Sequence, residues 1–242
     1  MPERHGGTVG LSIVIPAFNE AGRIAASLRA ILEYLEAAGR DGEIIVVDDG
    51  SHDATVEMVS GILGEGGPHR ILTGRANRGK GFSVREGALA ATRPWTLLSD
   101  ADLSTPIAEV DRLLMVAMEG ELDLVMGSRA LAGSRIGVYQ GWLRRNMGRS
   151  FNLVMRAITG LPFKDTQCGF KLWRTASIRP LLGRLTIDGF AWDVELLVLA
   201  RRAGLSLAEV PVEWNDVEGS TVAMVADPLR MLRDLVRIRL RR

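Results

Sequence analysis

Short strand-like runs of apolar residues alternate with amphipathic segments over the first half of the chain. The runs cover residues 12–15, 43–47, 70–73, 95–98 and 122–126. Runs of this length, rich in valine, isoleucine and leucine, are typical of strands buried within a parallel sheet. The five alternations of strand and helix predict an α/β fold, in which helices cover both faces of a mostly parallel sheet.

The segments between these runs have the features of helices. Asn19 is expected to cap the first helix, whose apolar positions between Ile24 and Leu35 lie on one helical face. Gly39 follows as the expected C-terminal signal of this helix. The other helices of this half are predicted to begin at Asp53, near Phe82 and at residues 104–106.

The alternation changes after about residue 128, without a repeat or a linker that would separate two domains. We therefore expect a single domain. Its second half is predicted to contain a helix over the basic segment 134–160, a helix from about Ala191, a strand over 207–214 and a last helix over 227–242.

Composition narrows the class of protein. Hydrophobic residues make up 47% of the chain, enough for one large core, and nothing indicates disorder. The single cysteine, Cys168, excludes an internal disulfide and a thiolate metal cluster. The first residues lack the apolar core of a secretory signal, and no stretch of 18 residues is apolar without a charge. We therefore expect a cytoplasmic protein that does not span a membrane.

The formal net charge of +1 conceals a strong asymmetry. Residues 1–128 contain 11 lysines and arginines against 19 acidic residues, whereas residues 129–242 contain 19 against 10. The two parts thus carry net charges of −8 and +9. An acidic part suits a divalent metal, and a basic part suits phosphate or an anionic surface. The alternative is an uneven distribution of charged surface residues that has no function, which would give the same net charges.

Acidic residues follow three of the predicted strands, in the segments 16–20, 47–51 and 99–102. The carboxyl ends of parallel strands form the ligand-binding edge of α/β proteins. Asp100 and Asp102 are the best metal candidates, because Mg²⁺ and Mn²⁺ prefer carboxylate oxygens together with substrate phosphates. The alternative is that both acids only stabilise the start of the following helix.

The segment GRANRGKG (74–81) matches the first part of a phosphate-binding P-loop. Gly81, however, stands where the P-loop hydroxyl would hold Mg²⁺, and residues 16–20 lack the glycine fingerprint of a dinucleotide site. These differences exclude a P-loop nucleotide triphosphatase and a nicotinamide enzyme. Lys80 and its flanking glycines remain candidates for contacts with phosphates or a sugar, and a plain glycine-rich turn is the alternative.

Two basic amphipathic helices are predicted in the second half. Arg144, Arg145 and Arg149 share one of them with aromatic and apolar residues. The other, over residues 228–242, has six arginines against one acid. Helices of this kind can lie on an anionic membrane surface. Packing of the first against the core, and a contact between copies of the chain for the last, are the alternatives.

Six segments together resemble the family 2 glycosyltransferases and, within that family, the dolichyl-phosphate sugar synthases. They are SIVIPAFNE (12–20), EIIVVDDGSHD (43–53), NRGKG (77–81), SDADLSTP (99–106), GSR (127–129) and DTQCGFKLW (165–173). Their order and spacing make the combination specific, and it covers roughly residues 11–220. The resemblance implies a nucleotide-diphospho-sugar transferase (GT-A) fold, inversion at the anomeric carbon and a requirement for Mg²⁺ or Mn²⁺.

Carried over position by position, the resemblance implies a nucleoside pocket and a metal–diphosphate site. Phe18 would border the base, and Asp49 would accept a hydrogen bond from it. Asp100 and Asp102 would hold the metal and the diphosphate. The implied donor site comprises Pro16, Phe18, Glu20, Val47, Asp49, Lys80, Asp100, Ala101 and Asp102.

The implied acceptor is a polyprenyl phosphate, whose charge explains the basic half. Arg129, Arg144 and Arg145 are the residues expected at its phosphate. Asp193 would serve as a general base for a sugar hydroxyl, but a phosphate acceptor is already an anion, so the role of Asp193 stays open. We expect a peripheral protein on the cytoplasmic face of a membrane, with no nucleic-acid partner.

These expectations divide the chain into four parts. They are a tail (1–10), a nucleotide-sugar-binding half (11–128), an acceptor-binding half of the same domain (129–220) and a basic amphipathic helix (221–242).

The segment WNDVEGS (214–220), together with DTQCGFKLW (165–173) and NRGKGFSVREG (77–87), is more similar to the glucosyl-lipid branch than to the mannosyl-lipid branch, which favours UDP-glucose over GDP-mannose. Thr221 departs from that branch, which often has lysine there. A different acceptor, either a diglucosyl-type lipid or a polysaccharide, is a further alternative. A sugar nucleotidyltransferase would need a glycine-rich basic loop after the first strand, where this chain has PAFNE (16–20). A nucleotide-sugar-binding protein without catalysis is the alternative from another class, and the presence of both Asp100 and Asp102 argues against it.

Overall fold

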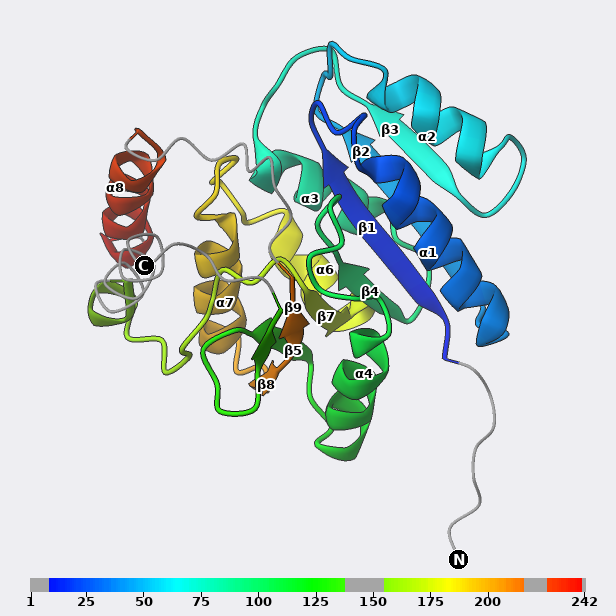
Figure 1. Ribbon diagram of the computed structural model, residues 1–242. Coiled ribbons are helices and arrows are strands. Elements are labelled where there is room, and N and C mark those ends of the chain that lie inside the picture. The colour runs from blue at the N-terminus through cyan, green and yellow to red at the C-terminus, as the bar shows by residue number, and fades with distance from the viewer. Residues whose placement is uncertain (1–8, 138–154, 216–225, 241–242) are drawn as a thin grey trace, which may run out of the picture.

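A computed structural model describes residues 9–137, 155–215 and 226–240, and Figure 1 shows their arrangement. Seven strands form a central sheet in the order β3-β2-β1-β4-β7-β5-β8. These strands are β1 (Leu11–Ala17), β2 (Gly42–Asp48), β3 (Arg70–Thr73), β4 (Trp95–Leu98), β5 (Leu124–Ser128), β7 (Lys171–Arg174) and β8 (Leu207–Pro211). A small second sheet pairs β6 (Arg135–Ile136) with β9 (Glu213–Trp214).

The helices lie on both sides of the central sheet (Figure 1). They are α1 (Ile24–Ala37), α2 (Thr55–Leu63), α3 (Lys80–Ala90), α4 (Glu109–Glu119), α6 (Thr175–Leu182), α7 (Trp192–Arg202) and α8 (Ala226–Leu240). The predicted α/β class and single domain are thus confirmed. None of the helices in these described ranges is both long enough and apolar enough to cross a membrane.

Side chains alternate between two cores along the strands, as the period of an extended chain requires. In β1, Ile13 and Ile15 pack in the core under α1, α2 and α4, whereas Val14 packs in the core under α3, α6, α7 and α8. Because both faces are covered, the strands are apolar on both sides, which is the reason for the short apolar runs in the sequence.

One strand of the central sheet was not predicted from the sequence. β7 runs antiparallel to both of its neighbours, β4 and β5, whereas the other pairs in this sheet are parallel. Its residues KLWR include two charges and lack the apolar pattern of the other strands. This inserted strand brings residues 165–171 to the carboxyl end of β4, so it helps to form the site.

Several predicted boundaries differ from the structure. Asn19 does not cap α1: its φ is +55°, and its Oδ1 accepts a hydrogen bond from the N–H of His52, which joins two loops. The helix predicted over 134–160 is wrong at its start, where β6 forms, while residues 155–159 are helical. The strand predicted over 207–214 changes sheets at Val212 and becomes β8 and β9.

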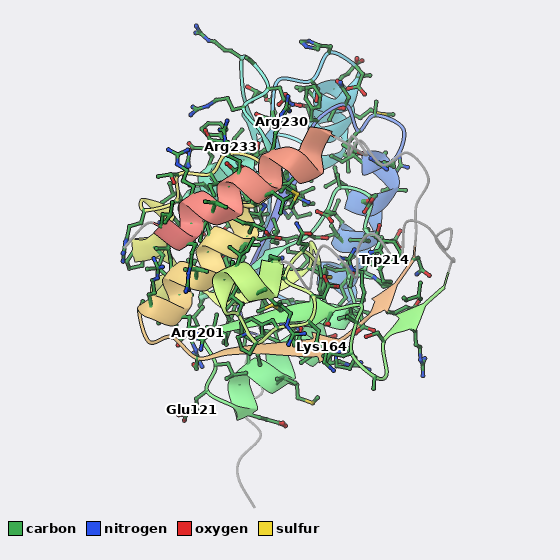
Figure 2. All side chains as sticks on the ribbon, turned by 90° about the vertical axis from the view of Figure 1, so that its left-hand side faces the viewer. Glu121, Lys164, Arg201, Trp214, Arg230 and Arg233 are labelled. Carbon is green, nitrogen blue, oxygen red and sulfur yellow. The ribbon has the colours of Figure 1, made fainter. Side chains whose placement is uncertain are left out.

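The last helix lies across α7, as Figure 2 shows. Met231, Leu235 and Ile238 are buried in the core, so most of the described apolar face of α8 packs against the protein itself. Val236 and Leu240 point outward, with 49% and 76% of their surface exposed. The apolar side predicted to contact a membrane is therefore largely used in folding, because amphipathic helices gain stability by covering a core.

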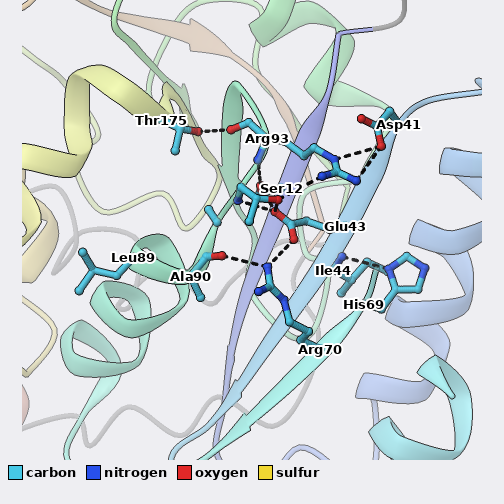
Figure 3. A network of polar contacts seen from close by, with 12 residues as sticks. Ser12, Asp41, Glu43, Ile44, His69, Arg70, Leu89, Ala90, Arg93 and Thr175 are labelled. Carbon is cyan, nitrogen blue, oxygen red and sulfur yellow. Dashed lines mark hydrogen bonds and ion pairs between the residues drawn. The ribbon is translucent and has the colours of Figure 1, made fainter. Parts of the chain in front are cut away.

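The amino-terminal edge of the sheet is closed by a polar network around the buried Glu43 (Figure 3). Its carboxylate accepts hydrogen bonds from Ser12 Oγ at 2.6 Å, from the N–H of Thr92 at 2.6 Å and from Arg70 Nη2 at 2.5 Å. Burial alone would raise the pKa of Glu43, but these donors hold that pKa below its usual range. The network fastens β1, β2 and β3 at the edge opposite the candidate site.

Candidate active site

Two aspartates lie directly after β4, at the carboxyl edge of the sheet. The Nζ of Lys80, the first residue of α3, donates a hydrogen bond to Oδ1 of Asp100 at 2.5 Å. Burial alone would raise the pKa of Asp100, but the charge of Lys80, with Lys171 and Arg129 further away, holds that pKa below its usual range. Asp100 is therefore a carboxylate at neutral pH, and 35% of its side chain is exposed.

Asp102 is held by a tight turn. Its Oδ1 accepts hydrogen bonds from the N–H of Ser104 at 3.0 Å and from Ser104 Oγ at 2.8 Å. Its Oδ2 lies 3.9 Å from Nη1 of Arg23, and Nη2 of Arg23 donates to Glu20 at 2.9 Å. Arg23 thus connects Glu20, which follows β1, to Asp102, which follows β4.

These two carboxylates fit a divalent cation that is bound together with a diphosphate. Among the described residues there is no group of three His, Cys, Asp or Glu side chains that could hold a metal ion. A cation here would take its remaining ligands from substrate oxygens and water, as Mg²⁺ and Mn²⁺ do at phosphate sites. Asp100 and Asp102 are the residues that would hold it.

The glycine-rich loop is anchored from both sides. Asp49 accepts hydrogen bonds from the N–H groups of Arg78 at 2.9 Å and Gly79 at 2.7 Å. Burial raises the pKa of Asp49, and these two bonds only partly offset that effect. The N–H of Gly81 donates to the carbonyl of Asp188 at 2.7 Å. A Cβ at Gly81 would lie 2.4 Å from the carbonyl oxygen of Ile187, so close packing explains this glycine.

The residues expected around a nucleoside lie at the ends of β1 and β2. Pro16 and Val47 are register partners in these strands. Phe18 is half-buried and meets His52 edge-on, with 6.4 Å between the ring centroids. The side chain of Val47 is buried in the core, against α3, so it presents no open surface to a ligand. Ala101, between the two aspartates, is buried as well.

Arg129, after β5, is clamped by a carboxylate that the sequence analysis did not single out. Its Nε and Nη2 donate to the two oxygens of Asp165 at 2.7 and 2.9 Å, and its N–H donates to Oδ2 at 2.9 Å. Burial alone would raise the pKa of Asp165, but Arg129 holds it below the usual range. The guanidinium also lies 5.5 Å from the ring of Trp214 in β9. Asp165 thus occupies the fork formed by Nε and Nη2 and fixes the orientation of the guanidinium at this edge of the sheet.

Asp193 lies in the first turn of α7 and is buried. Its Oδ2 is 3.5 Å from Nζ of Lys171, a fully buried lysine that also donates to the carbonyl of Cys168 at 2.5 Å. Burial raises the pKa of Asp193, and Lys171 only partly offsets this effect. The nearby Glu195 instead receives the N–H groups of Thr186 and Ile187, so it fixes the loop before α7.

The fold thus brings three buried or half-buried ion pairs to one edge of the sheet. They are Lys80–Asp100, Arg129–Asp165 and Lys171–Asp193. Arg23, Asp165 and Lys171 were not predicted as site residues from the sequence. The segment DTQCGFK contains two of them, but only the position of β7 reveals that this segment lies at the carboxyl end of β4. Arg144 and Arg145, expected at the acceptor phosphate, lie outside the described residues.

Residues 12–179 match the family model described as Glycosyl transferase family 2. The chain belongs to this family. The dolichyl-phosphate beta-glucosyltransferase of Saccharomyces cerevisiae is 34% identical to it, over 95% of this chain and 74% of that protein. The enzyme of the same name from Drosophila melanogaster is 36% identical, over 94% and 74%.

Solved structures of glycosyltransferases share the fold. Glucosyl-3-phosphoglycerate synthase from Mycobacterium tuberculosis, in complex with Mn²⁺, UDP-glucose and phosphoglyceric acid, superposes with a TM-score of 0.67 at 19% identity, over 97% of this chain and 80% of that chain. Mannosyl-3-phosphoglycerate synthase from Rubrobacter xylanophilus gives a TM-score of 0.65 at 19% identity, over 96% and 73%. The implied GT-A fold is confirmed for this family 2 glycosyltransferase.

The bond between Lys80 and Asp100 leads to a prediction for metal binding. A divalent cation bound by Asp100 would compete with the Lys80 ammonium for the same carboxylate, so we expect Lys80→Met to bind Mn²⁺ more tightly when no nucleotide is present. Both side chains are partly exposed, so we expect an effect of only about fivefold. Titration with Mn²⁺, followed by electron paramagnetic resonance, measures it. Lys164→Met, at an exposed lysine, serves as the control. Weaker Mn²⁺ binding by Lys80→Met would contradict the competition.

Proposed function

We propose that this family 2 glycosyltransferase transfers glucose from UDP-glucose to a polyprenyl phosphate of the dolichyl phosphate type, with inversion at the anomeric carbon. The observation that carries the proposal is the identity of 31–36% with proteins named dolichyl-phosphate beta-glucosyltransferase, over nearly the whole chain. The proposed chemistry agrees with the partial exposure of Asp100 and Asp102, at 35% and 22%, and with the positive charges of Lys80, Lys171 and Arg129 that act on Asp100.

The donor would lie along the carboxyl ends of β1, β2 and β4. Phe18 and Asp49 would contact the base, while Asp100 and Asp102 would bind the diphosphate together with Mg²⁺ or Mn²⁺. That cation, when bound, neutralises the charge that develops on the departing nucleoside diphosphate. Lys80, released from Asp100, would add a second positive charge on the diphosphate oxygens.

The acceptor would be an anion that needs orientation rather than deprotonation. A phosphate monoester with a second pKa near 6 is already a nucleophile at neutral pH, so catalysis rests on its position and on charge neutralisation. Arg129, held in one orientation by Asp165, is the described residue that we assign to this phosphate. Arg144 and Arg145 remain proposed partners. Asp193, paired with Lys171, would shape the site electrostatically and would not need to accept a proton.

We further propose that the protein acts on the surface of a membrane, at its cytoplasmic face. Gln167 of the site segment approaches the sulfur of Met231 with its Nε2 at 3.9 Å, so α8 borders the site. The described arginines of α8 are exposed, and Figure 2 marks two of them, Arg230 and Arg233. Because the apolar face of α8 packs against α7, attraction of these charges to anionic headgroups would dominate the contact.

Membrane binding of this kind should depend strongly on salt and on α8. We expect Arg233→Gln combined with Arg237→Gln to weaken binding to vesicles that contain anionic lipid by about tenfold, because each basic residue near such a surface contributes on the order of 1 kcal/mol. Co-sedimentation with the vesicles at low and high salt measures this. The control combines Arg29→Gln with Arg112→Gln, on α1 and α4. Equal losses for both pairs would contradict a specific role for α8.

Binding of the donor tests the nucleotide assignment. Calorimetric titrations with UDP and GDP, each with and without Mn²⁺, should give tight binding for UDP with Mn²⁺ and weak binding for the other combinations. Tighter binding of GDP would favour the GDP-mannose alternative. If the folded protein binds neither UDP nor GDP, the proposed donor site is wrong.

A further inference from the structure

The carboxylate of Asp100 lies against the backbone of Gly169, in the segment that precedes β7. A Cβ atom built on Gly169 would lie 1.9 Å from Oδ2, 2.3 Å from Cγ and 2.5 Å from Oδ1 of Asp100. Distances below 3.0 Å essentially never occur for real Cβ atoms, so no side chain fits there while Asp100 stays in place. We propose that Gly169 is a positioning residue, which sets the orientation of the Asp100 carboxylate for a metal-bound diphosphate.

Conformation does not explain this glycine. The φ angle of Gly169 lies outside the left-handed region, unlike the φ angles of Gly50, Gly79 and Gly160. An alanine could adopt the backbone of Gly169 without strain. The position therefore requires glycine for space, and the three atoms nearest to the added Cβ all belong to the Asp100 carboxylate.

The backbone at Gly169 has no room to retreat. Its neighbours Cys168 and Phe170 are each 1% exposed. The carbonyl of Cys168 accepts the hydrogen bond from Lys171 Nζ, and the carbonyl of Phe170 accepts one from the N–H of Gly127 at 2.8 Å. The Phe170 bond joins the segment to β5, and Lys171 also lies 3.5 Å from Asp193 of α7, so a clash would be relieved by the more mobile partner. That partner is the Asp100 side chain, which is 35% exposed.

The expected consequence is local. In Gly169→Ala the Asp100 carboxylate would turn away from the segment, while the cores on both sides of the sheet stay intact. A displacement of about 1 Å at a catalytic group is enough to lower the reaction rate strongly, because catalysis depends on a geometry that rigid neighbours fix. The inference rests on the proposed function, in that it takes Asp100 to bind the metal and the diphosphate.

A double-mutant cycle tests the inference with binding as the readout. The proteins are wild type, Gly169→Ala, Asp100→Asn and the double variant, with Gly183→Ala as a control, because a Cβ at Gly183 has no neighbour within 4 Å. We expect Gly169→Ala to weaken the binding of UDP in the presence of Mn²⁺ by about tenfold or more, with the melting temperature close to that of the control. In the Asp100→Asn background, the same change should weaken binding by less than about twofold.

The outcomes separate the two levels of the proposal. If Asp100→Asn binds UDP and Mn²⁺ like the wild type, the assignment of Asp100 fails, and with it the proposed function of this edge. If Asp100→Asn loses binding but a folded Gly169→Ala keeps it, the role of Gly169 is overturned and the donor site stands. An equal loss from Gly169→Ala in both backgrounds would show that Gly169 acts through another group, which also overturns the inference.

Discussion

Replacement of Asp102 by asparagine should abolish glycosyl transfer while the protein stays folded. The amide oxygen of asparagine can still accept the hydrogen bonds from the N–H and Oγ of Ser104, so the turn after β4 is retained. The charge and the second oxygen that the proposed metal–diphosphate complex would use are lost. Metal ions contribute several kcal/mol to such reactions, so we expect a decrease in kcat of about 1,000-fold, equivalent to about 4 kcal/mol.

The assay is the initial rate of transfer at saturating donor and Mn²⁺, with circular dichroism and a melting curve as checks of the fold. Asp111→Asn is the matched control, because Asp111 lies exposed on α4, away from the edge that carries Asp102. It should keep at least about half of the wild-type rate, since exposed ion pairs contribute little. Near-normal turnover by a folded Asp102→Asn protein would remove the metal–diphosphate assignment.

Replacement of Asp165 by asparagine should destabilise the protein at neutral pH and weaken the dependence of its unfolding free energy on pH. Arg129 lowers the pKa of Asp165 in the folded state. The ionised carboxylate therefore stabilises the fold fully at pH values above about 4, the usual pKa of an aspartate in the unfolded chain. This contribution is lost as the pH falls through the lower pKa of the folded state. Removal of one partner from a buried pair leaves the other charge without compensation, and we expect a loss of about 3 kcal/mol at pH 7.

Urea unfolding at pH 7, 5, 4 and 3 measures both effects. Asp41→Asn is the matched control, because Asp41 pairs with Arg93 at 2.9 Å but is 63% exposed. That variant should lose less than about 1 kcal/mol, as surface pairs do. The difference in stability between wild type and Asp165→Asn should shrink as the pH falls from 5 to 3. A constant difference over this range would show that Asp165 does not stabilise the fold through its charge.

The strand pattern of the first half was sufficient to predict this edge of the sheet. A parallel strand that ends at residue 98 must leave Asp100 and Asp102 at the carboxyl edge, and the structure places them there. The ends of the helices were predicted less well than the strands, because the same polar residues can form hydrogen bonds in loops or at helix ends. Asn19 shows this: the side chain that was expected to cap α1 instead bonds to the loop after β2.

The second half resisted prediction for a topological reason. β7 is short, charged and antiparallel, and it enters the sheet between strands that are distant from it in the sequence. No periodicity in residues 165–174 indicates that Asp165 and Lys171 will lie at the edge of the sheet that carries the aspartates after β4. The role of Gly169 is hidden for a related reason, since a close approach of a backbone to a distant carboxylate leaves no signal other than the glycine itself.

The most direct test of the proposed activity is the transfer reaction itself. The purified chain, with Mn²⁺ and a short polyprenyl phosphate in detergent, is incubated in separate reactions with UDP-glucose and GDP-mannose, each labelled in the sugar. The organic phase is then extracted and counted. We predict label in the lipid from UDP-glucose, in a product that is lost on mild acid, with none after chelation of the metal. Two results would contradict the proposal. One is label from GDP-mannose alone, and the other is no lipid-bound label from folded protein that still binds UDP.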